Sequence, residues 1–245
     1  MTKFKRILLT VSAMLVVLPS ACVGGAYVWI SNPKQERLAL PPELVSLESA
    51  EGKALLAEST ARADHESLEA HYQAQEKQSW CGVASAAVVL NSFSAAAPMT
   101  QTGFFDDCTA NVRSSFRTTF GGMPLAAFGR MMQCHGVEAR VYHAENSSLD
   151  EFRRLVVENL RTKENFVVVN YDRAGVGQKP TGHISPISAY HEGSDRFLIL
   201  DVANYKYPPV WAKASALWAA MNTLDSESKR TRGYVLLSRA AKTTN

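Results

Sequence analysis

One cysteine stands where a helix would activate it as a nucleophile. The chain has four cysteines in 245 residues, and Cys81 opens the small, apolar run CGVASAAVVLNSF, which is expected to form a buried helix. A thiol at a helix N-terminus faces unpaired backbone N–H groups and the positive end of the helix dipole, and both lower its pKa toward the thiolate. Cys81 is therefore a candidate nucleophile; the alternative is a small side chain that begins a core helix.

The second half of the sequence offers this thiol a base. The stretch GHISPISAYHEGSDRFLILDV, residues 182–202, is expected to form two strands joined by the five-residue loop HEGSD. If Tyr190 faces Arg196 in this hairpin, His183 and Asp201 become diagonal neighbours on one face of the sheet. A histidine oriented by a carboxylate can take the proton of a thiol, as in a catalytic triad. Either residue alone would also fit a purely structural role.

A glutamine precedes the cysteine at an informative distance. Gln75 lies six residues before Cys81. In papain-like enzymes a glutamine at this spacing donates a side-chain N–H to the oxyanion hole, beside the backbone N–H of the cysteine, and such a donor contributes about 10²–10³ in rate. The chain order, cysteine first and histidine later, is also papain-like. The residue that orients the histidine is usually Asn in those enzymes, whereas here it would be Asp201.

Composition and charge exclude several other classes of protein. The apolar fraction of 46% and the charged fraction of 20% are those of an ordinary globular chain. The net charge of +3 comes from interspersed acids and bases, so we expect no nucleic-acid partner. The sequence has no Gly-rich phosphate loop, CxxC pair or HExxH motif, and its other histidines lack metal-ligand spacing. A homodimer is left open.

The first 30 residues are expected to direct export. Lys3, Lys5 and Arg6 precede an uncharged, mostly apolar run over residues 7–30, which is typical of a signal peptide and also long enough for a membrane anchor. Cleavage, lipidation at Cys22 or retention of the segment would each place the rest of the chain outside the cytoplasm. We therefore expect an exported protein, periplasmic or membrane-anchored, that contacts the membrane only through this segment.

The remaining sequence indicates an α+β fold. Residues 31–48 contain three prolines and are expected to form a linker, and residues 49–240 are expected to form one domain. The helical patterns come first and the strand patterns later, unlike an alternating βαβ chain. Helices are expected over residues 49–69, 81–93 and 123–134 and after the capping-box pair Ser148 and Glu151, and further strands over residues 137–143 and 166–170.

Two of the cysteines have no role in this site. In an oxidising compartment Cys108 and Cys134 can form a disulfide, which would close a loop of about 25 residues and contribute about 3 kcal/mol of stability. They equally fit two free, buried thiols, because the sequence does not give their separation. Both alternatives remain open at this point.

Several long stretches of the sequence resemble the phytochelatin synthase family, in its short bacterial type. The resemblance covers roughly residues 38–238 and implies a papain-like α+β fold, in which a helical N-terminal half carries the cysteine helix and packs on an antiparallel, sheet-rich C-terminal half. It implies the same triad: Cys81, His183 and Asp201. The stretches are SLESAEGKALLAESTARAD, CGVASAAVVLNSF, VVVNYDR, GHISPISAYHEGSDRFLILDVANYKYPPVW and TRGYVLLS.

The resemblance also implies a substrate and the residues that bind it. The family cleaves the Cys–Gly bond of glutathione through a γ-glutamylcysteinyl acyl-enzyme, which passes to a second glutathione or to water. A γ-glutamyl group is a zwitterion that needs a carboxylate and an Arg fork, and the resemblance assigns these roles to Asp225 and Arg232. It places Arg173 and Lys206 near the acceptor or glycine end. Without the resemblance, all four would be ordinary surface charges.

No cofactor is expected for the acyl step. Cadmium or zinc is expected only as an activator or as part of a metal–glutathione substrate. Plant-type members carry a further Cys-rich C-terminal region that this sequence lacks, so we expect hydrolysis to compete strongly with polymerisation. The alternatives are a hydrolase or amidase acting on other γ-glutamyl thiols and a non-catalytic metal-binding module. The module is the weaker of the two, because its cysteines lack CxxC spacing.

Overall fold

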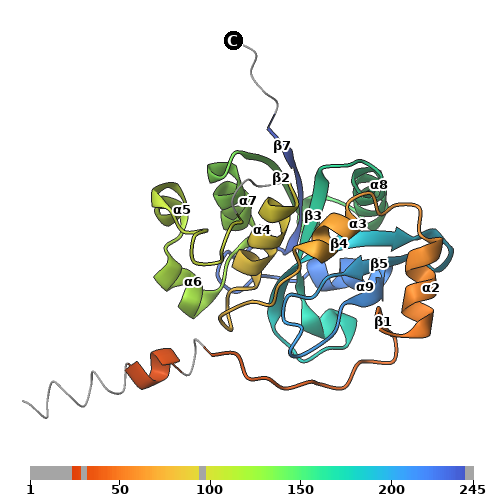
Figure 1. Ribbon diagram of the computed structural model, residues 1–245, viewed down its shortest axis with the longest axis horizontal. Coiled ribbons are helices and arrows are strands. Elements are labelled where there is room, and N and C mark those ends of the chain that lie inside the picture. The colour runs from red at the N-terminus through yellow and green to blue at the C-terminus, as the bar shows by residue number, and fades with distance from the viewer. Residues whose placement is uncertain (1–23, 29–31, 94–97, 241–245) are drawn as a thin grey trace, which may run out of the picture.

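A seven-stranded antiparallel sheet forms the centre of the structure, a computed structural model that describes residues 24–28, 32–93 and 98–240 (Figure 1). The strands follow the order β1-β6-β5-β4-β3-β7-β2, and each neighbouring pair is antiparallel. Their bounds are β1 Val45–Ser46, β2 Val137–His143, β3 Asn165–Asp172, β4 Gly182–His191, β5 Arg196–Ile199, β6 Val210–Lys213 and β7 Gly233–Arg239.

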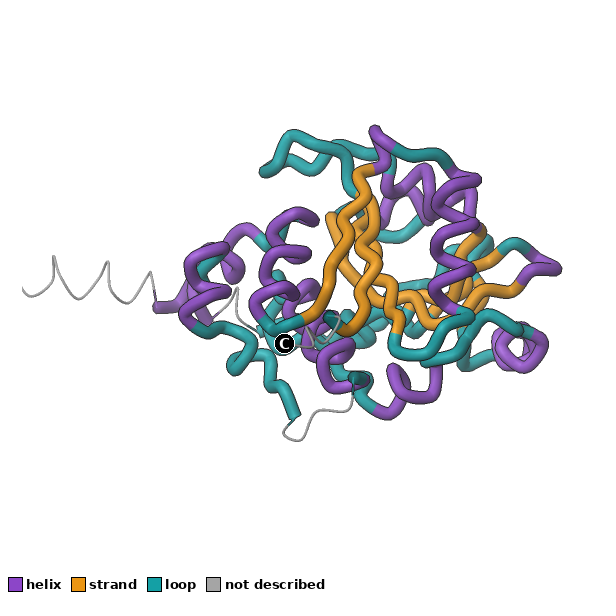
Figure 2. The backbone as a smooth tube through the Cα atoms, turned by 90° about the horizontal axis from the view of Figure 1, so that it is seen from above, coloured by secondary structure: helices purple, strands orange, loops and turns teal. Residues whose placement is uncertain are grey.

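Helices cover both faces of this sheet, so it lies between two helical layers (Figure 2). The helices are α2 Ala50–Glu58, α3 His65–Ala70, α4 Cys81–Ser92, α5 Asp107–Val112, α6 Ser115–Gly121, α7 Leu125–Cys134, α8 Leu149–Leu160 and α9 Ala214–Met221, with short 3₁₀ helices η1 Ala144–Asn146, η2 Arg173–Val176 and η3 Glu192–Ser194. Helices α4 and α7 pack on one face, and α8 and α9 on the other. The α+β prediction is confirmed, whereas its papain-like part stays a prediction.

The apolar run of β3 explains why both faces are covered. Successive side chains of a strand point to opposite faces. Phe166 and Val168 therefore join the core cluster that contains α4 and α7, while Val167 and Val169 join the cluster that contains α8 and α9. A continuous apolar run is the sequence signature of such a central strand.

The N-terminal part of the chain differs from the prediction in two places. The helix expected over residues 49–69 is two helices, because the chain becomes extended at Ser59 and Ala61 pairs with Tyr190 near the end of β4. The expected linker, residues 31–48, is not a free tether: its described part contains strand β1, and the Leu38 amide donates to the carbonyl oxygen of Lys206 at 2.9 Å. The folded unit thus begins before residue 49.

The predicted leader lies mostly outside the described residues. Of its 30 residues, only 24–28 are described, and they are helical. Within the described parts of the chain, no helix combines the length and apolar character that crossing a membrane requires.

The predicted register of the β4–β5 hairpin is wrong near its turn and right below it. Tyr190 pairs with Phe197, not with Arg196. A β-bulge in β4 then shifts the pairing by one residue, so that Ile187 pairs with Ile199 as predicted. The bulge restores the expected alignment at the far end of the hairpin, where the candidate triad residues lie.

A disulfide links two helices beside the sheet. Cys108 in α5 and Cys134 at the end of α7 are bonded, with their Cα atoms 5.7 Å apart. The closed loop contains α6 and the turn that follows it, so the bond ties down this whole segment. Of the two alternatives that the sequence left open, the structure has the paired one.

Candidate active site

The candidate nucleophile stands at the junction of a helix and the sheet. Cys81 is the first residue of α4, and the other residues of this helix are buried. The helix packs on β4, where the Ser85 hydroxyl donates to the carbonyl oxygen of Ile184 at 3.1 Å. Gly82 permits this close approach, because a Cβ there would lie 3.3 Å from the Cδ1 atom of Ile184. The first amides of α4 have no partners within the helix, so they are available beside the thiol.

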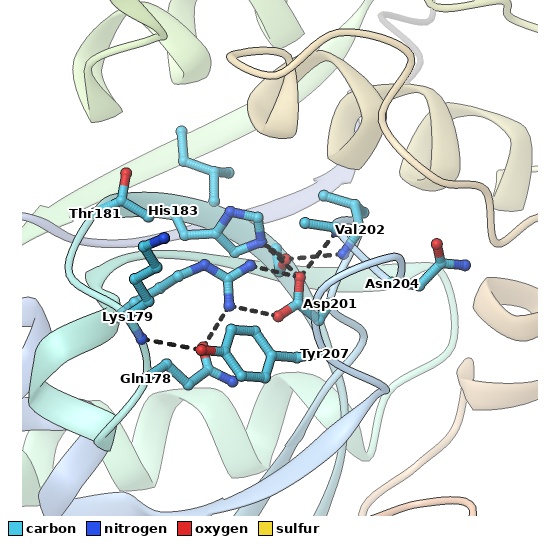
Figure 3. A network of polar contacts seen from close by, with 12 residues as sticks. Gln178, Lys179, Thr181, His183, Asp201, Val202, Asn204 and Tyr207 are labelled. Carbon is cyan, nitrogen blue, oxygen red and sulfur yellow. Dashed lines mark hydrogen bonds and ion pairs between the residues drawn. The ribbon is translucent and has the colours of Figure 1, made fainter. Parts of the chain in front are cut away.

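The candidate base and its carboxylate meet as the strand alternation predicts (Figure 3). His183 lies on β4 and Asp201 follows β5, and the Nε2 atom of the imidazole lies 2.9 Å from Oδ1 of the carboxylate. Both side chains are buried. Cys81 and His183 line the same cavity, whose volume is about 390 Å³. Because Asp201 occupies Nε2, the other ring nitrogen, Nδ1, is the one left to receive a proton from a thiol.

A buried arginine grips the same carboxylate. Arg173, at the start of η2, is only 1% exposed, and its two terminal nitrogens each donate to one oxygen of Asp201 at 2.7 Å. The guanidinium also donates to the side-chain oxygen of Gln178 and lies over the ring of Tyr207. This two-point fork fixes the plane of the carboxylate that orients His183.

Burial and this network set the ionisation of the three groups. Burial alone would raise the pKa of Asp201, but Arg173 and then His183 hold it well below its ordinary value. Burial, followed by the positive charge of Arg173, lowers the pKa of His183 to about 4. Burial raises the pKa of the Cys81 thiol, against hydrogen bonds from the backbone and the charge of Arg173. Both shifts favour a neutral thiol and a neutral imidazole in the resting site.

This ionisation corrects the expectation that the helix N-terminus alone makes a thiolate. The dipole and the amides favour the thiolate, whereas burial of the thiol opposes it and raises its pKa.

Gln75 lies at the cavity but is engaged elsewhere. It is buried, and its side-chain nitrogen donates to the carbonyl oxygens of Lys77 at 2.9 Å and Gln78 at 2.6 Å. The structure therefore places the amide beside the cavity, with its donors turned into its own loop. The predicted oxyanion role requires one of these two bonds to be released.

Charged side chains from two loops, the α9–β7 loop and the β5–β6 loop, face the same cavity. Asp225 and Arg232 line one part of it, and Lys206 lines another. Arg232 is buried and uses Nη1 for bonds to Thr223 and to the carbonyl oxygen of Leu224, while its Nε atom is buried without a hydrogen-bond partner among the described residues. A guanidinium group at a cavity wall is suited to an anionic ligand.

Comparison with known proteins identifies the relatives of this site. A family model described as phytochelatin synthase matches residues 35–234. The chain belongs to the phytochelatin synthase family. It is similar to proteins named glutathione gamma-glutamylcysteinyltransferase 1 from Lotus japonicus, 34% identical over 210 residues, and from Arabidopsis thaliana, 32% identical over 211 residues. Each match covers 83% of this chain and 42% or 44% of the relative.

A relative from another organism is covered to a similar extent. The chain is 28% identical over 208 residues to a glutathione gamma-glutamylcysteinyltransferase of Schizosaccharomyces pombe, a match that covers 81% of this chain and 50% of that protein. This phytochelatin synthase family member therefore spans about half the length of the curated relatives it matches.

The phytochelatin synthase resemblance seen in the sequence is thus confirmed, and the predicted site residues lie together. Seven of the eight line the cavity, and the eighth, Asp201, lies behind His183. Their individual roles stay predictions. For Arg173 the geometry favours a different role from the one the resemblance implied, because its guanidinium grips Asp201.

One functional contact escaped the sequence reasoning. The Ser185 hydroxyl lies 2.9 Å from Nε2 of His183 and accepts a hydrogen bond from the backbone N–H of Val202 at 3.3 Å. It therefore links His183 to the loop that carries Asp201. A signal for it exists, because residues 183 and 185 share one face of a strand. Among the described residues, no group of three or more His, Cys, Asp or Glu side chains could hold a metal ion.

Proposed function

We propose that this protein cleaves the Cys–Gly bond of glutathione through a γ-glutamylcysteinyl thioester on Cys81. The observation that carries the proposal is the shared cavity, in which Cys81 and His183 lie together with the charged side chains of Asp225 and Arg232. The names of the relatives support the same substrate and transfer reaction.

In the first half of the reaction glycine leaves. His183 takes the thiol proton at Nδ1, and the sulfur attacks the carbonyl carbon of the cysteinyl residue of glutathione. The C–N bond to glycine then breaks, and the glycine nitrogen receives the proton from His183. The backbone N–H of Cys81, joined by Gln75 once it releases a loop carbonyl, would stabilise the oxyanion. The product is a thioester and free glycine.

The donor is held by its zwitterionic γ-glutamyl end. The Asp225 carboxylate is suited to the α-ammonium group and the free N–H groups of Arg232 to the α-carboxylate. Gly182 leaves room for this fork, because a Cβ there would lie 3.2 Å from Nη2 of Arg232. These contacts recognise the end that both the substrate and the acyl-enzyme carry.

In the second half the thioester meets water or another glutathione. Water gives γ-glutamylcysteine, and the α-amine of a second glutathione gives phytochelatin-2, the product of a single transfer. Because water is always present, hydrolysis should dominate at low glutathione and transfer should rise with its concentration. Cadmium or zinc would enter as metal–glutathione thiolate substrate, or as an activator.

The test is a glutathione titration of the purified protein, with and without cadmium or zinc, in which glycine, γ-glutamylcysteine and phytochelatin-2 are separated and quantified. Glycine release that disappears in Cys81→Ala supports the proposal. Absence of glycine release from the wild type at every glutathione concentration would overturn it. Release from other γ-glutamyl thiols, but not from glutathione, would instead support the broader hydrolase. A phytochelatin-2 excess from the lowest concentration upward would refute the hydrolytic bias.

A further inference from the structure

A second, smaller cavity opens beside the first one. Its volume is about 200 Å³, and Gln78 and Lys206 line both cavities. The rest of its wall comes from the loop residues Lys179 and Tyr205 and from the N-terminal segment at residues 33–36. The two cavities are thus neighbours that meet at Gln78 and Lys206.

The N-terminal segment is fixed in place at this cavity. The Leu38 amide donates to the carbonyl oxygen of Lys206 at 2.9 Å. Arg37 donates to the carbonyl oxygen of Asn204 at 2.9 Å and forms an ion pair with Glu48 at 2.9 Å. Two of these contacts hold residues 37 and 38 against the loop that carries Lys206, and the preceding residues Pro33, Lys34 and Glu36 line the cavity.

The chemistry of the second cavity favours a carboxylate. Burial and then the positive charge of Arg173 lower the pKa of Lys206. The positive charge of Lys179 lowers it further, so the two lysine side chains lie close together. The Tyr205 side chain is only 7% exposed, and its hydroxyl is buried without a hydrogen-bond partner in the described part of the chain. Neighbouring ammonium groups and an unpaired hydroxyl donor are what an anionic group requires.

The transfer reaction supplies such a group. The α-amine of the acceptor glutathione has to reach the thioester on Cys81, while the donor occupies the side of the first cavity lined by Asp225 and Arg232. The cysteinyl and glycyl parts of the acceptor must then leave by another side. An extended tripeptide reaches about 10 Å, enough to carry its terminal carboxylate into a neighbouring cavity.

We propose that the second cavity binds the glycine carboxylate of the acceptor glutathione, and that the N-terminal segment at residues 33–36 forms one wall of this acceptor subsite. This inference rests on the proposed function. In the step it serves, the neutral α-amine attacks the thioester carbonyl carbon and a C–N bond forms. The C–S bond breaks, and the proton released from nitrogen returns through His183 to the sulfur of Cys81.

Two substitutions of opposite sign test the subsite. Lys179→Gln removes a positive charge from the cavity and should lower the ratio of phytochelatin-2 to γ-glutamylcysteine about three- to tenfold. Glu36→Gln removes a negative charge from the N-terminal wall and should raise the same ratio, about twofold. The matched control is Lys53→Gln on the exposed face of α2, which should leave the ratio unchanged.

A change of acceptor provides a second readout. The glycine ethyl ester of glutathione forms the same acyl-enzyme but lacks the terminal charge, so its transfer ratio in the wild type should be lower than that of glutathione. Lys179→Gln should narrow this difference. The subsite is overturned if Lys179→Gln and Lys53→Gln give equal ratios, if the ester transfers as well as glutathione, or if the wild type only hydrolyses. Absence of any glycine release would instead overturn the proposed function itself.

Discussion

At the scale of single residues, Arg173 decides the charge of the buried centre. Its two terminal nitrogens each donate a short, buried hydrogen bond to one oxygen of Asp201, and together these bonds fix the plane of the carboxylate. Arg173→Met should lower the rate of glycine release about a hundredfold or more and the free energy of unfolding by about 3–5 kcal/mol, because it breaks a buried ion pair. Arg173→Lys should recover part of both. The measurements are the glycine release rate and a denaturant titration.

A pH profile separates positioning of the base from acceptor binding by Arg173. Because the charge of Arg173 lowers the pKa of His183, Arg173→Met should move the acid limb of glycine release to higher pH. Loss of transfer with hydrolysis and its pH profile intact would contradict the positioning role. That result would restore the acceptor role implied by the resemblance.

The proposed glycine release by the wild-type protein should also persist at unusually low pH. His183 has to be neutral to accept the thiol proton, and burial followed by Arg173 lowers its pKa to about 4. Glycine release, measured as kcat/KM from pH 4 to 8, should therefore keep its activity where an ordinary histidine, with a pKa of about 6.5, is already protonated. An acid limb centred at or above pH 6.5 would contradict this assignment.

The same shift has a consequence for stability. The unfolded chain binds a proton at His183 below about pH 6.5, and the folded chain binds it only near pH 4. Protonation of His183 therefore does not reduce the free energy of unfolding above about pH 6.5, and it reduces that free energy progressively as the pH falls from about 6.5 to about 4.

The sequence could place the members of the candidate triad because each follows a local rule. Cys81 begins a helix, and His183 and Asp201 lie at the open end of a hairpin. The fork of Arg173 follows no such rule, because it depends on how η2 packs against α9 and β3. The pKa of the thiol was mispredicted for a related reason: the helix terminus is visible in the sequence, but the depth of burial is not.

At the scale of elements, α6 forms a wall of the active site. Residues 120–123, at the end of α6 and just after it, line the cavity. The carbonyl oxygen of Thr119 accepts a hydrogen bond from the hydroxyl of Ser79, two residues before Cys81. The Cys108–Cys134 bond closes the loop that contains this helix. The position of the wall relative to the thiol thus depends on the disulfide.

Loss of the disulfide should loosen that wall. Cys108→Ser should lower the free energy of unfolding by about 3 kcal/mol, as expected for a loop of this length. Because the wall faces the substrate and carries no triad residue, KM for glutathione should rise more than kcat falls. Cys134→Ser should behave alike, since either change breaks the same bond. Equal stability and KM in wild type and both variants would contradict the structural role of the bond.

The elements that the sequence predicted well are those with a strong local pattern. Strand β2 has the predicted bounds, and the helix expected at 81–93 is α4. Strand β1 was read as linker because two residues carry no periodicity, and it exists only through pairing with β6. The predicted hairpin register failed at Tyr190 because a bulge is a tertiary feature.

At the scale of the whole molecule, we propose that the leader exports the protein. The disulfide supports this proposal, because such bonds persist mainly in oxidising compartments. A fusion of residues 1–40 to a reporter enzyme that is active only outside the cytoplasm should be active. The matched control replaces Lys3, Lys5 and Arg6 by Glu and should lose activity. A wild-type fusion that accumulates in the cytoplasm and shows no reporter activity would contradict export.

The central claim is the thioester on Cys81, and the intact mass of the protein tests it most directly. Wild-type protein mixed with glutathione and quenched in acid within the first turnover should gain the mass of glutathione less glycine. The gain should disappear in Cys81→Ala and after treatment with hydroxylamine, which cleaves thioesters. Glycine release without this mass gain, or the same gain in Cys81→Ala, would contradict the account.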